Sequence, residues 1–164
     1  IPYIESLGLD NLSVATPDIG GAKRAHSYAS YLNAPLVVCH KHREKANEVA
    51  KMIAIGEVKD RNIILLDDMI DTGGTITKAA NMFMEQGARS VRAVATHPVL
   101  SGAAYENLNN SMLSEVILTD TIPLRADKDT SKLTVLSTAD VFADVISRVY
   151  NYNEISSQFI FAHK

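Results

Sequence analysis

Residues 62–75 read NIILLDDMIDTGGT, and this stretch decides which fold the chain can have. The unbroken apolar run from Ile63 to Leu66 predicts a strand over 62–66 that is buried on both faces, as in a parallel sheet. Beyond the glycines, apolar residues recur at helical spacing up to Gly87, which is a natural C-terminal cap. The stretch therefore predicts a buried strand, a glycine-containing loop and an amphipathic helix in succession.

The same alternation of short apolar runs and amphipathic stretches continues through the 164 residues, as in a sheet covered by helices. Further strands are predicted at 12–16, 36–39, 49–55, 91–96, 116–119 and 133–136, and further helices at 22–32, 105–108 and 142–149. The polar stretch 40–48 is expected to form a loop or the tip of a small flexible hairpin. We predict a single α/β domain over 1–164, with a doubly wound, mostly parallel sheet flanked by helices. Ligands of such sheets bind beyond the carboxyl ends of the strands.

The loop after this apolar strand has the composition of a phosphate site. Gly73 and Gly74 let the backbone turn tightly and direct N–H groups at an anion. The following helix points the positive end of its dipole at the same place. Thr72 and Thr75 add hydroxyl donors that suit a phosphate monoester.

Asp67 and Asp68 begin this loop and would repel a phosphate, so we assign them to another part of the ligand. Paired carboxylates at a strand end can accept hydrogen bonds from sugar hydroxyls or hold Mg²⁺ through water. The simpler alternative is a capped tight turn with solvated acids. Because three Asp, two Thr and two Gly residues share one strand-to-helix loop, we favour the ligand site.

Two further segments carry glycine or charge at the ends of strands. Residues 16–24, TPDIGGAKR, lie at a strand-to-helix junction and offer a second anion site, although the same pattern forms ordinary turns. Residues 40–48, HKHREKANE, are rich in cations, which usually form a solvated surface. A mobile cationic loop can instead neutralise a phosphoryl group during its transfer.

Composition narrows the classes of protein. A net charge of −3 and a pI near 5.9 argue against general nucleic-acid binding. No apolar run reaches the roughly 20 residues of a membrane span, and the N-terminus does not read as a signal peptide. A single cysteine, Cys39, permits no intrachain disulfide and favours a cytoplasmic setting. No zinc site is assigned, and His97 is expected to be structural.

Residues 64–76, ILLDDMIDTGGTI, resemble the phosphoribosyl-pyrophosphate binding motif of type I phosphoribosyltransferases and ribose-phosphate pyrophosphokinases. The resemblance implies that the 5-phosphate of ribose 5-phosphate is held by Asp71, Thr72, Gly73, Gly74 and Thr75. It implies that Asp67 and Asp68 face the ribose hydroxyls. This motif alone does not separate the two groups of enzymes.

Other segments resemble the pyrophosphokinases in particular. By that resemblance, residues 16–24 form the loop that receives the pyrophosphoryl group at Gly20 and Gly21, with Asp18 as a Mg²⁺ contact. Residues 40–49 resemble the catalytic flexible loop, in which Lys41 and Arg43 stabilise the transition state.

Three more segments complete the resemblance. Residues 95–102 and 119–123 look like signatures of the pyrophosphokinases at strand ends. The ending at 155–159 is similar to the C-terminus of that family, where a serine helps to form an allosteric phosphate or ADP site between subunits. Ser156 is the nearest match, and a frayed polar tail is the alternative.

The resemblance implies a ribose-phosphate diphosphokinase, which transfers pyrophosphate from ATP to ribose 5-phosphate with Mg²⁺ and gives phosphoribosyl pyrophosphate and AMP. The chain would be its C-terminal half, without the N-terminal domain that supplies most of the ATP site, and would be inactive alone. The whole enzyme is expected to be a homo-oligomer with no nucleic-acid or membrane partner. The alternatives are a phosphoribosyltransferase, although no hood segment is visible, and a non-catalytic regulatory paralogue, although the catalytic loop is intact.

Overall fold

The computed structural model describes residues 1–42 and 51–156, with the backbone alone at Lys41, His42 and Lys51. In these ranges seven strands form one sheet, in the order β3-β2-β1-β4-β5-β6-β7. The strands are β1 (Leu12–Thr16), β2 (Leu36–His42), β3 (Lys51–Ile55), β4 (Asn62–Ile70), β5 (Ser90–Pro98), β6 (Glu115–Thr119) and β7 (Leu133–Leu136). Neighbouring strands are parallel, except that β2 and β3 run antiparallel. The predicted mostly parallel sheet is confirmed.

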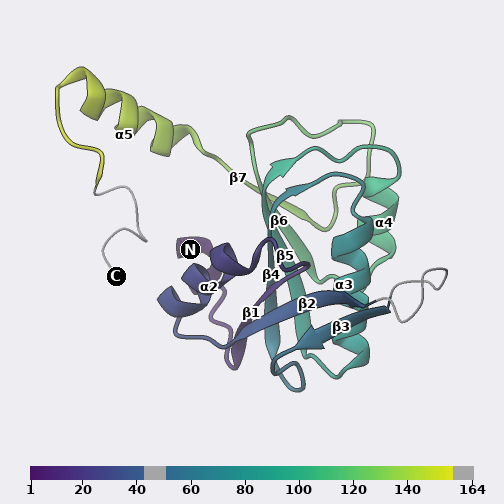
Figure 1. Cartoon of the computed structure of the whole chain (residues 1–164). Coiled ribbons are helices and arrows are strands. Elements are labelled where there is room, and N and C mark those ends of the chain that lie inside the picture. Colours follow the sequence, from purple (N-terminus) through teal and green to yellow (C-terminus); the bar gives the residue numbers. More distant parts are fainter. Residues whose placement is uncertain (43–50, 157–164) are drawn as a thin grey trace.

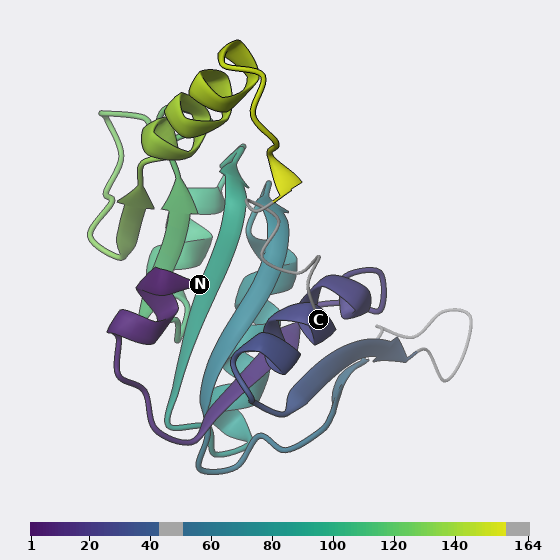
Figure 2. The ribbon, with the colours of Figure 1, turned by 90° about the vertical axis from the view of Figure 1, so that its left-hand side faces the viewer.

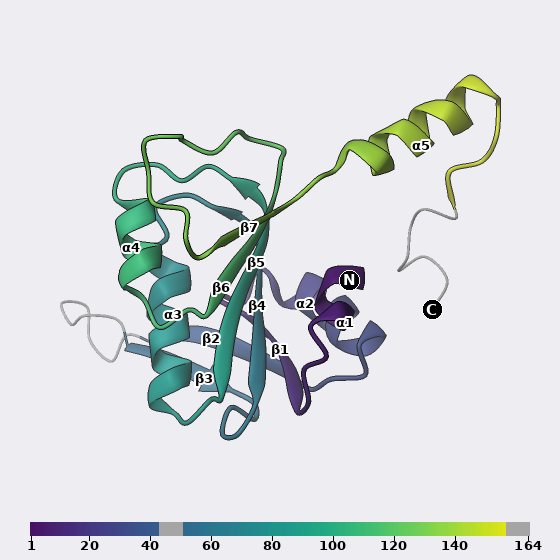
Figure 3. The same ribbon diagram turned by 180° about the vertical axis from the view of Figure 1, so that it is seen from behind.

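Helices cover both faces of this sheet. The described helices are α1 (Pro2–Ser6), α2 (Ala22–Tyr31), α3 (Gly74–Glu85), α4 (Ala104–Asn110) and α5 (Ala139–Tyr150). α3 and α4 lie on one face, and α1 and α2 lie on the other (Figures 1 and 3). α1 was not predicted, because five residues are too few to show a helical period. None of the described helices has the length and apolarity that a membrane crossing requires.

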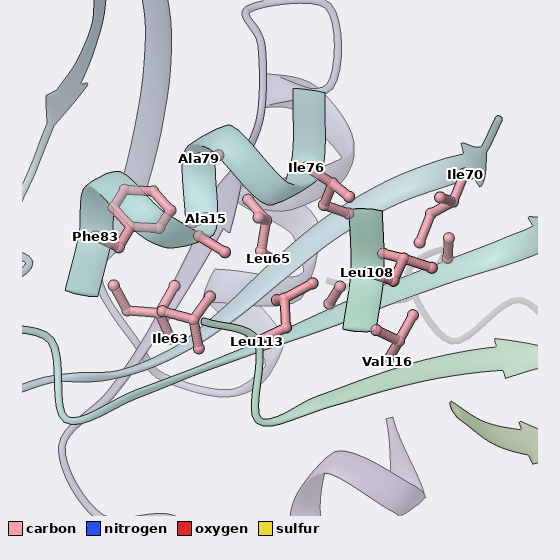
Figure 4. Packing of buried hydrophobic residues seen from close by; sticks show 14 of the residues in the cluster. Ala15, Ile63, Leu65, Ile70, Ile76, Ala79, Phe83, Leu108, Leu113 and Val116 are labelled. Carbon is pink, nitrogen blue, oxygen red and sulfur yellow. The ribbon is translucent and has the colours of Figure 1, made fainter. Parts of the chain in front are cut away.

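The apolar run of β4 is divided between two cores. Ile63 and Leu65 belong to the larger cluster, beneath α3 and α4, while Ile64 and Leu66 belong to the smaller cluster beneath α2. Figure 4 shows Phe83 of α3 directed at the sheet beside Ile63. Successive side chains of a strand point to opposite faces, so a continuous apolar run requires cover on both sides.

Two strands are longer than the sequence predicted. β4 continues to Ile70 because β5 runs beside it to Pro98, and these two residues are paired in register. Asp67 and Asp68 therefore lie on the strand, and the expectation that they belong to the strand-to-helix loop is wrong. β2 likewise continues to His42, because β3 pairs with it antiparallel. Residues 43–48 of the predicted polar loop, and residues 49–50 of the strand predicted at 49–55, lie outside the described residues.

The final helix is confirmed, but its expected packing against the sheet is not. α5 projects away, beyond the carboxyl ends of the central strands (Figures 1 and 2), and its Phe142 and Ile146 side chains are 61% and 66% exposed. The start of α5 is held by Asp120, which accepts hydrogen bonds from Ser137 Oγ (2.7 Å), Thr138 N (2.8 Å) and Thr138 Oγ1 (2.6 Å). Hydrogen bonds from Thr138 and Ser137 lower the pKa of Asp120 to about 2.

One phenylalanine in the core and one on exposed α5 allow a matched prediction about the free energy of unfolding. Phe83 is fully buried, so Phe83→Ala should lower the free energy of unfolding by about 3–5 kcal/mol. Phe142→Ala makes the same chemical change on exposed α5 and should cost less than about 0.5 kcal/mol. Denaturant unfolding of both variants measures the difference. A loss at Phe142 as large as that at Phe83 would contradict the position of α5.

Candidate functional site

The predicted site segments meet at one edge of the sheet. From β1 the chain proceeds to β2 on one side, whereas β4 returns on the other side of β1. Ligands of open α/β sheets bind where the strand order reverses in this way, beyond the carboxyl ends. Residues 17–21 follow β1, and residues 71–73 follow β4. β2 runs parallel to β1, so the backbone of Lys41 reaches the same edge, while Arg43 lies outside the described residues.

A pocket of about 160 Å³ lies where β4 passes into α3. It is lined by Asp67, Met69, Ile70, Asp71, Thr72, Gly73, Gly74, Thr75 and Ile76. The loop residues predicted to bind phosphate are therefore together, and Asp67 joins them. The volume is below the roughly 300–1,000 Å³ of pockets for drug-sized ligands, so the pocket suits a small polar group such as a phosphate.

The backbone at the start of α3 is open to an anion. Gly73 precedes the helix with a φ of 75°, a left-handed conformation that glycine adopts without strain. Within the described residues, no side chain caps the first turn of α3. The first N–H groups of a helix have no partner inside it, and they carry the positive end of the helix dipole. Thr77 Oγ1 donates to the Gly73 carbonyl oxygen at 2.9 Å, which steadies the turn from inside the helix.

Negative charge is concentrated beside this pocket. Burial raises the pKa of Asp67 to about 6, and the charges of Asp68 and Asp18 add to the effect. A hydrogen bond with Asp67, together with the Arg24 guanidinium, lowers the pKa of Asp68. The two neighbouring acids therefore hold a proton more readily than separate carboxyls would. Such a group favours hydroxyl donors or a cation as its partner.

The second glycine loop is closed by its own side chains. Asp18 Oδ1 accepts a hydrogen bond from Gly21 N at 3.0 Å, and Thr16 Oγ1 donates to the Asp18 carbonyl oxygen at 3.0 Å. A Cβ at Gly21 would overlap the Thr16 hydroxyl, so a larger residue would have to displace that hydroxyl from its hydrogen bond to Asp18. The Gly21 N–H is engaged by Asp18 in this arrangement, and an incoming anion would have to displace that carboxylate to use it.

An ion pair that the sequence did not suggest joins α2 to β4. Arg24 in α2 lies 3.5 Å from Asp68 in β4, with side chains 41% and 53% exposed. Exposed pairs of this kind contribute little to stability, about 0–1 kcal/mol. The pair instead keeps a cation next to the acids of the pocket.

Ser101 and Asn107 also contact the loop. Sequence analysis singled out the segment 95–102, which includes Ser101, but assigned no role to either side chain. Ser101 Oγ donates to Asp71 Oδ1, and Asn107 Nδ2 donates to the Thr72 carbonyl oxygen at 2.8 Å. Outside the pocket lining, His97 Nδ1 lies 3.0 Å from Thr121 Oγ1 at the ends of β5 and β6. Ser156 is exposed beyond α5, where its hydroxyl donates to Glu154.

The acids beside the pocket suit a metal ion whose other ligands are waters and a substrate. Among residues 1–42 and 51–156, His, Cys, Asp and Glu do not form a group of three that could hold a metal ion. Mg²⁺ is usually bound by one or two carboxylates, several waters and the phosphates of a substrate. Asp67, whose charged form is disfavoured by burial, fits such a partial set of ligands, because a cation would stabilise that charge.

Comparison with known proteins gives one consistent result. The family model described as the phosphoribosyl synthetase-associated domain matches residues 43–161. The ribose-phosphate pyrophosphokinase of Porphyromonas gingivalis is 49% identical over 157 residues, which are 96% of this chain and 50% of that protein. The ribose-phosphate pyrophosphokinase of Campylobacter jejuni is 49% identical over 158 residues, with the same coverage.

A solved structure has the same fold. The phosphoribosylpyrophosphate synthetase from Mycobacterium smegmatis superimposes with a TM-score of 0.84 at 39% identity. The match covers 93% of this chain and 49% of that one. The chain thus spans about half the length of the curated relatives it matches.

The raised pKa of Asp67 leads to a prediction about stability. Below pH 4 the carboxyl is protonated in both the folded and the unfolded chain, so its burial as a charge costs nothing. Between pH 4 and pH 6 the unfolded chain loses the proton first, and above pH 6 the full cost is present. Asp67→Asn should therefore stabilise the chain at pH 8 by roughly 1–2 kcal/mol, a value reduced for partial solvation, and leave it unchanged near pH 4.

Denaturant unfolding of the wild-type chain and Asp67→Asn at pH 4 and pH 8 measures this. The exposed Asp140→Asn on α5 is the control and should show no pH-dependent gain. An equal effect of Asp67→Asn at both pH values would contradict the burial of the Asp67 charge.

Proposed function

This chain belongs to the phosphoribosyl synthetase-associated domain family, and on that premise we propose that it is the ribose 5-phosphate-binding half of a ribose-phosphate diphosphokinase. The whole enzyme would transfer the pyrophosphoryl group of ATP to the anomeric hydroxyl of ribose 5-phosphate. Most of the ATP site is assigned to the other half of the full-length protein. The chain would also bind the product, phosphoribosyl pyrophosphate, and act within a homo-oligomer.

The observation that carries this proposal is the uncapped start of α3 behind the Gly73 turn. Its amides, together with the Thr72 and Thr75 hydroxyls, supply donors to a 5-phosphate. Asp71 to Thr75 line one small pocket, in the order that the phosphate-binding motif requires. The sugar would then extend from the phosphate toward the end of β4.

Asp67 and Asp68 are assigned to the sugar, because hydroxyl groups can donate to carboxylates that would repel a phosphate. Asp67 is the part-buried member that lines the pocket, and Asp68 is the exposed one paired with Arg24. Asp18 would contribute a further carboxylate from the neighbouring loop, whose Gly20 and Gly21 would receive the pyrophosphoryl group. Mg²⁺, when bound through these acids and the phosphates, would neutralise charge on the transferring group.

The proposed reaction is a single displacement. The anomeric hydroxyl oxygen attacks the β-phosphorus of ATP and loses its proton to water. The bond from that phosphorus to the α-phosphate oxygen breaks, and AMP leaves. Lys41 and Arg43 are assigned to the developing charge on the transferred group, Arg43 as a bidentate donor and Lys41 as a point charge. In support, Lys41 is at the end of β2, two strands from the phosphate loop at the same edge.

Binding of the sugar phosphate can be tested on this chain alone. In amide NMR spectra with Mg²⁺, ribose 5-phosphate should shift the Thr72 to Thr75 resonances in a saturable way, because those amides face the phosphate. Ribose without phosphate, at the same concentration, should leave them unchanged. A well-dispersed spectrum in which these resonances do not move would count against the proposed site.

The catalytic assignment is tested in the full-length protein. Lys41→Ala should lower kcat by about 10²–10³-fold, because a charge that stabilises the transition state is removed. The KM for ribose 5-phosphate should change little, because Lys41 is assigned to the transferred group. Lys59→Ala, on the loop before β4 at the opposite edge of the sheet, is the control. Equal losses in kcat and in ribose 5-phosphate binding would remove Lys41 from this role.

A further inference from the structure

The direction of the loop amides depends on where the loop carbonyls point. In a trans peptide the C=O of one residue and the N–H of the next lie in one plane and point in opposite directions. The Asp71 carbonyl therefore sets the direction of the Thr72 N–H, and the Thr72 carbonyl sets that of the Gly73 N–H. A group that holds these carbonyls on one side of the loop aims both amides at the other side.

The segment from Ser101 through α4 holds both carbonyls. Ser101 N donates to the Asp71 carbonyl oxygen at 3.1 Å, and Asn107 Nδ2 donates to the Thr72 carbonyl oxygen at 2.8 Å. α4 lies beside α3 (Figures 1 and 3), and the described pocket lining includes Thr72 and Gly73 but neither Ser101 nor Asn107. The two donors thus lie outside the pocket lining, and the amides that they orient point away from Ser101 and Asn107.

Ser101 has a second contact with the same loop. Its hydroxyl donates to Asp71 Oδ1, which draws this carboxylate toward the β5–α4 connection. A carboxylate beside a phosphate is repelled by it, so a hydrogen bond that turns the acid aside favours anion binding. Gly73 packs against the same segment, since a Cβ placed there would lie 3.7 Å from Asn107 Cβ and 3.6 Å from the Ala104 carbonyl oxygen.

We propose that Asn107, assisted by Ser101, is a positioning residue for the phosphate site, because it fixes the direction of the Gly73 N–H without touching the ligand. This inference rests on the proposed function. It adds a specific requirement. The phosphate-binding loop needs a side-chain donor from α4, and the motif at 67–75 alone does not orient its amides. One net hydrogen bond corresponds to about a fivefold change in affinity.

The chain offers a matched control on the same helix. Asn109 Nδ2 also donates to a backbone carbonyl oxygen, that of Asp129 at 3.2 Å, on the connection between β6 and β7. Asn107→Ala and Asn109→Ala therefore remove the same side chain and the same kind of bond from α4. They differ in whether the bond is made to the phosphate loop.

The experiment measures the dissociation constants of ribose 5-phosphate and inorganic phosphate for the wild-type chain and both variants, by amide NMR titration with Mg²⁺. Melting temperatures are recorded alongside. Asn107→Ala should weaken both ligands about fivefold and shift the free Gly73 amide resonance, whereas Asn109→Ala should bind as the wild type does. Equal affinities of the two variants, with a wild type that binds, would overturn the positioning role and leave the proposed function intact.

Two other results are also decisive. A folded wild-type chain that binds neither ligand removes the proposed function, and the inference with it. If Asn107→Ala does not fold, Ser101→Ala decides, because it frees the Asp71 carboxylate while the backbone donor at position 101 remains. Undiminished phosphate affinity in folded Ser101→Ala would then overturn the inference.

Discussion

β4 is stable only where both of its faces are covered, because four successive apolar side chains point alternately to the two sides of the sheet. α3 and α4 bury Ile63 and Leu65, and α2 buries Ile64 and Leu66. Hydrogen bonds to β1 and β5 fix the same strand along its two edges. The apolar first part of β4 is therefore constrained on four sides. The end of the strand, which is paired with β5, continues from this rigid base into the loop. Precise sites depend on such supports.

In the site, groups that attract cations lie a few residues from groups that attract anions. The acids at Asp67 and Asp68 precede the turn, and the anion-seeking amides of α3 follow it. In the free chain the acids repel one another, and burial disfavours the charge on Asp67. This local cost is tolerated because the core under β4 stabilises the fold by much more. Residues in strained environments commonly persist at functional sites for this reason.

The central part of the fold could be predicted from sequence because its signals are local. The apolar run of β4 and the spacing of Ile76, Ala79, Ala80 and Phe83 each require burial in a particular pattern. The end of β4 could not be predicted, because two aspartates look like a loop until β5 is placed beside them. Strand pairing of this kind depends on residues distant in sequence, which no short pattern records.

The same limit applies to the phosphate loop. Its glycines and threonines were identified by composition, and the structure gathers them in one pocket. The bond from Asn107 to Thr72 joins residues 35 positions apart and has no periodic signature. For α5, the amphipathic pattern indicated which face is apolar, but a pattern does not say whether anything packs against that face.

The exposed apolar stripe of α5, formed by Val141, Phe142, Ile146 and Val149, has a thermodynamic consequence. Its 12 residues are near the lower limit for an isolated helix in water, and none of them is buried in the described fold. The heat capacity of unfolding arises mainly from apolar surface newly exposed to water. Because the stripe is already exposed, α5 can unwind with almost no heat-capacity change, whereas opening the sheet carries most of it. The helical state of α5 depends on the hydrogen bonds to Asp120 and on the Asp144–Arg148 ion pair. Acid and salt weaken these contacts, so the stability of α5 depends on pH and salt more than the stability of the core does.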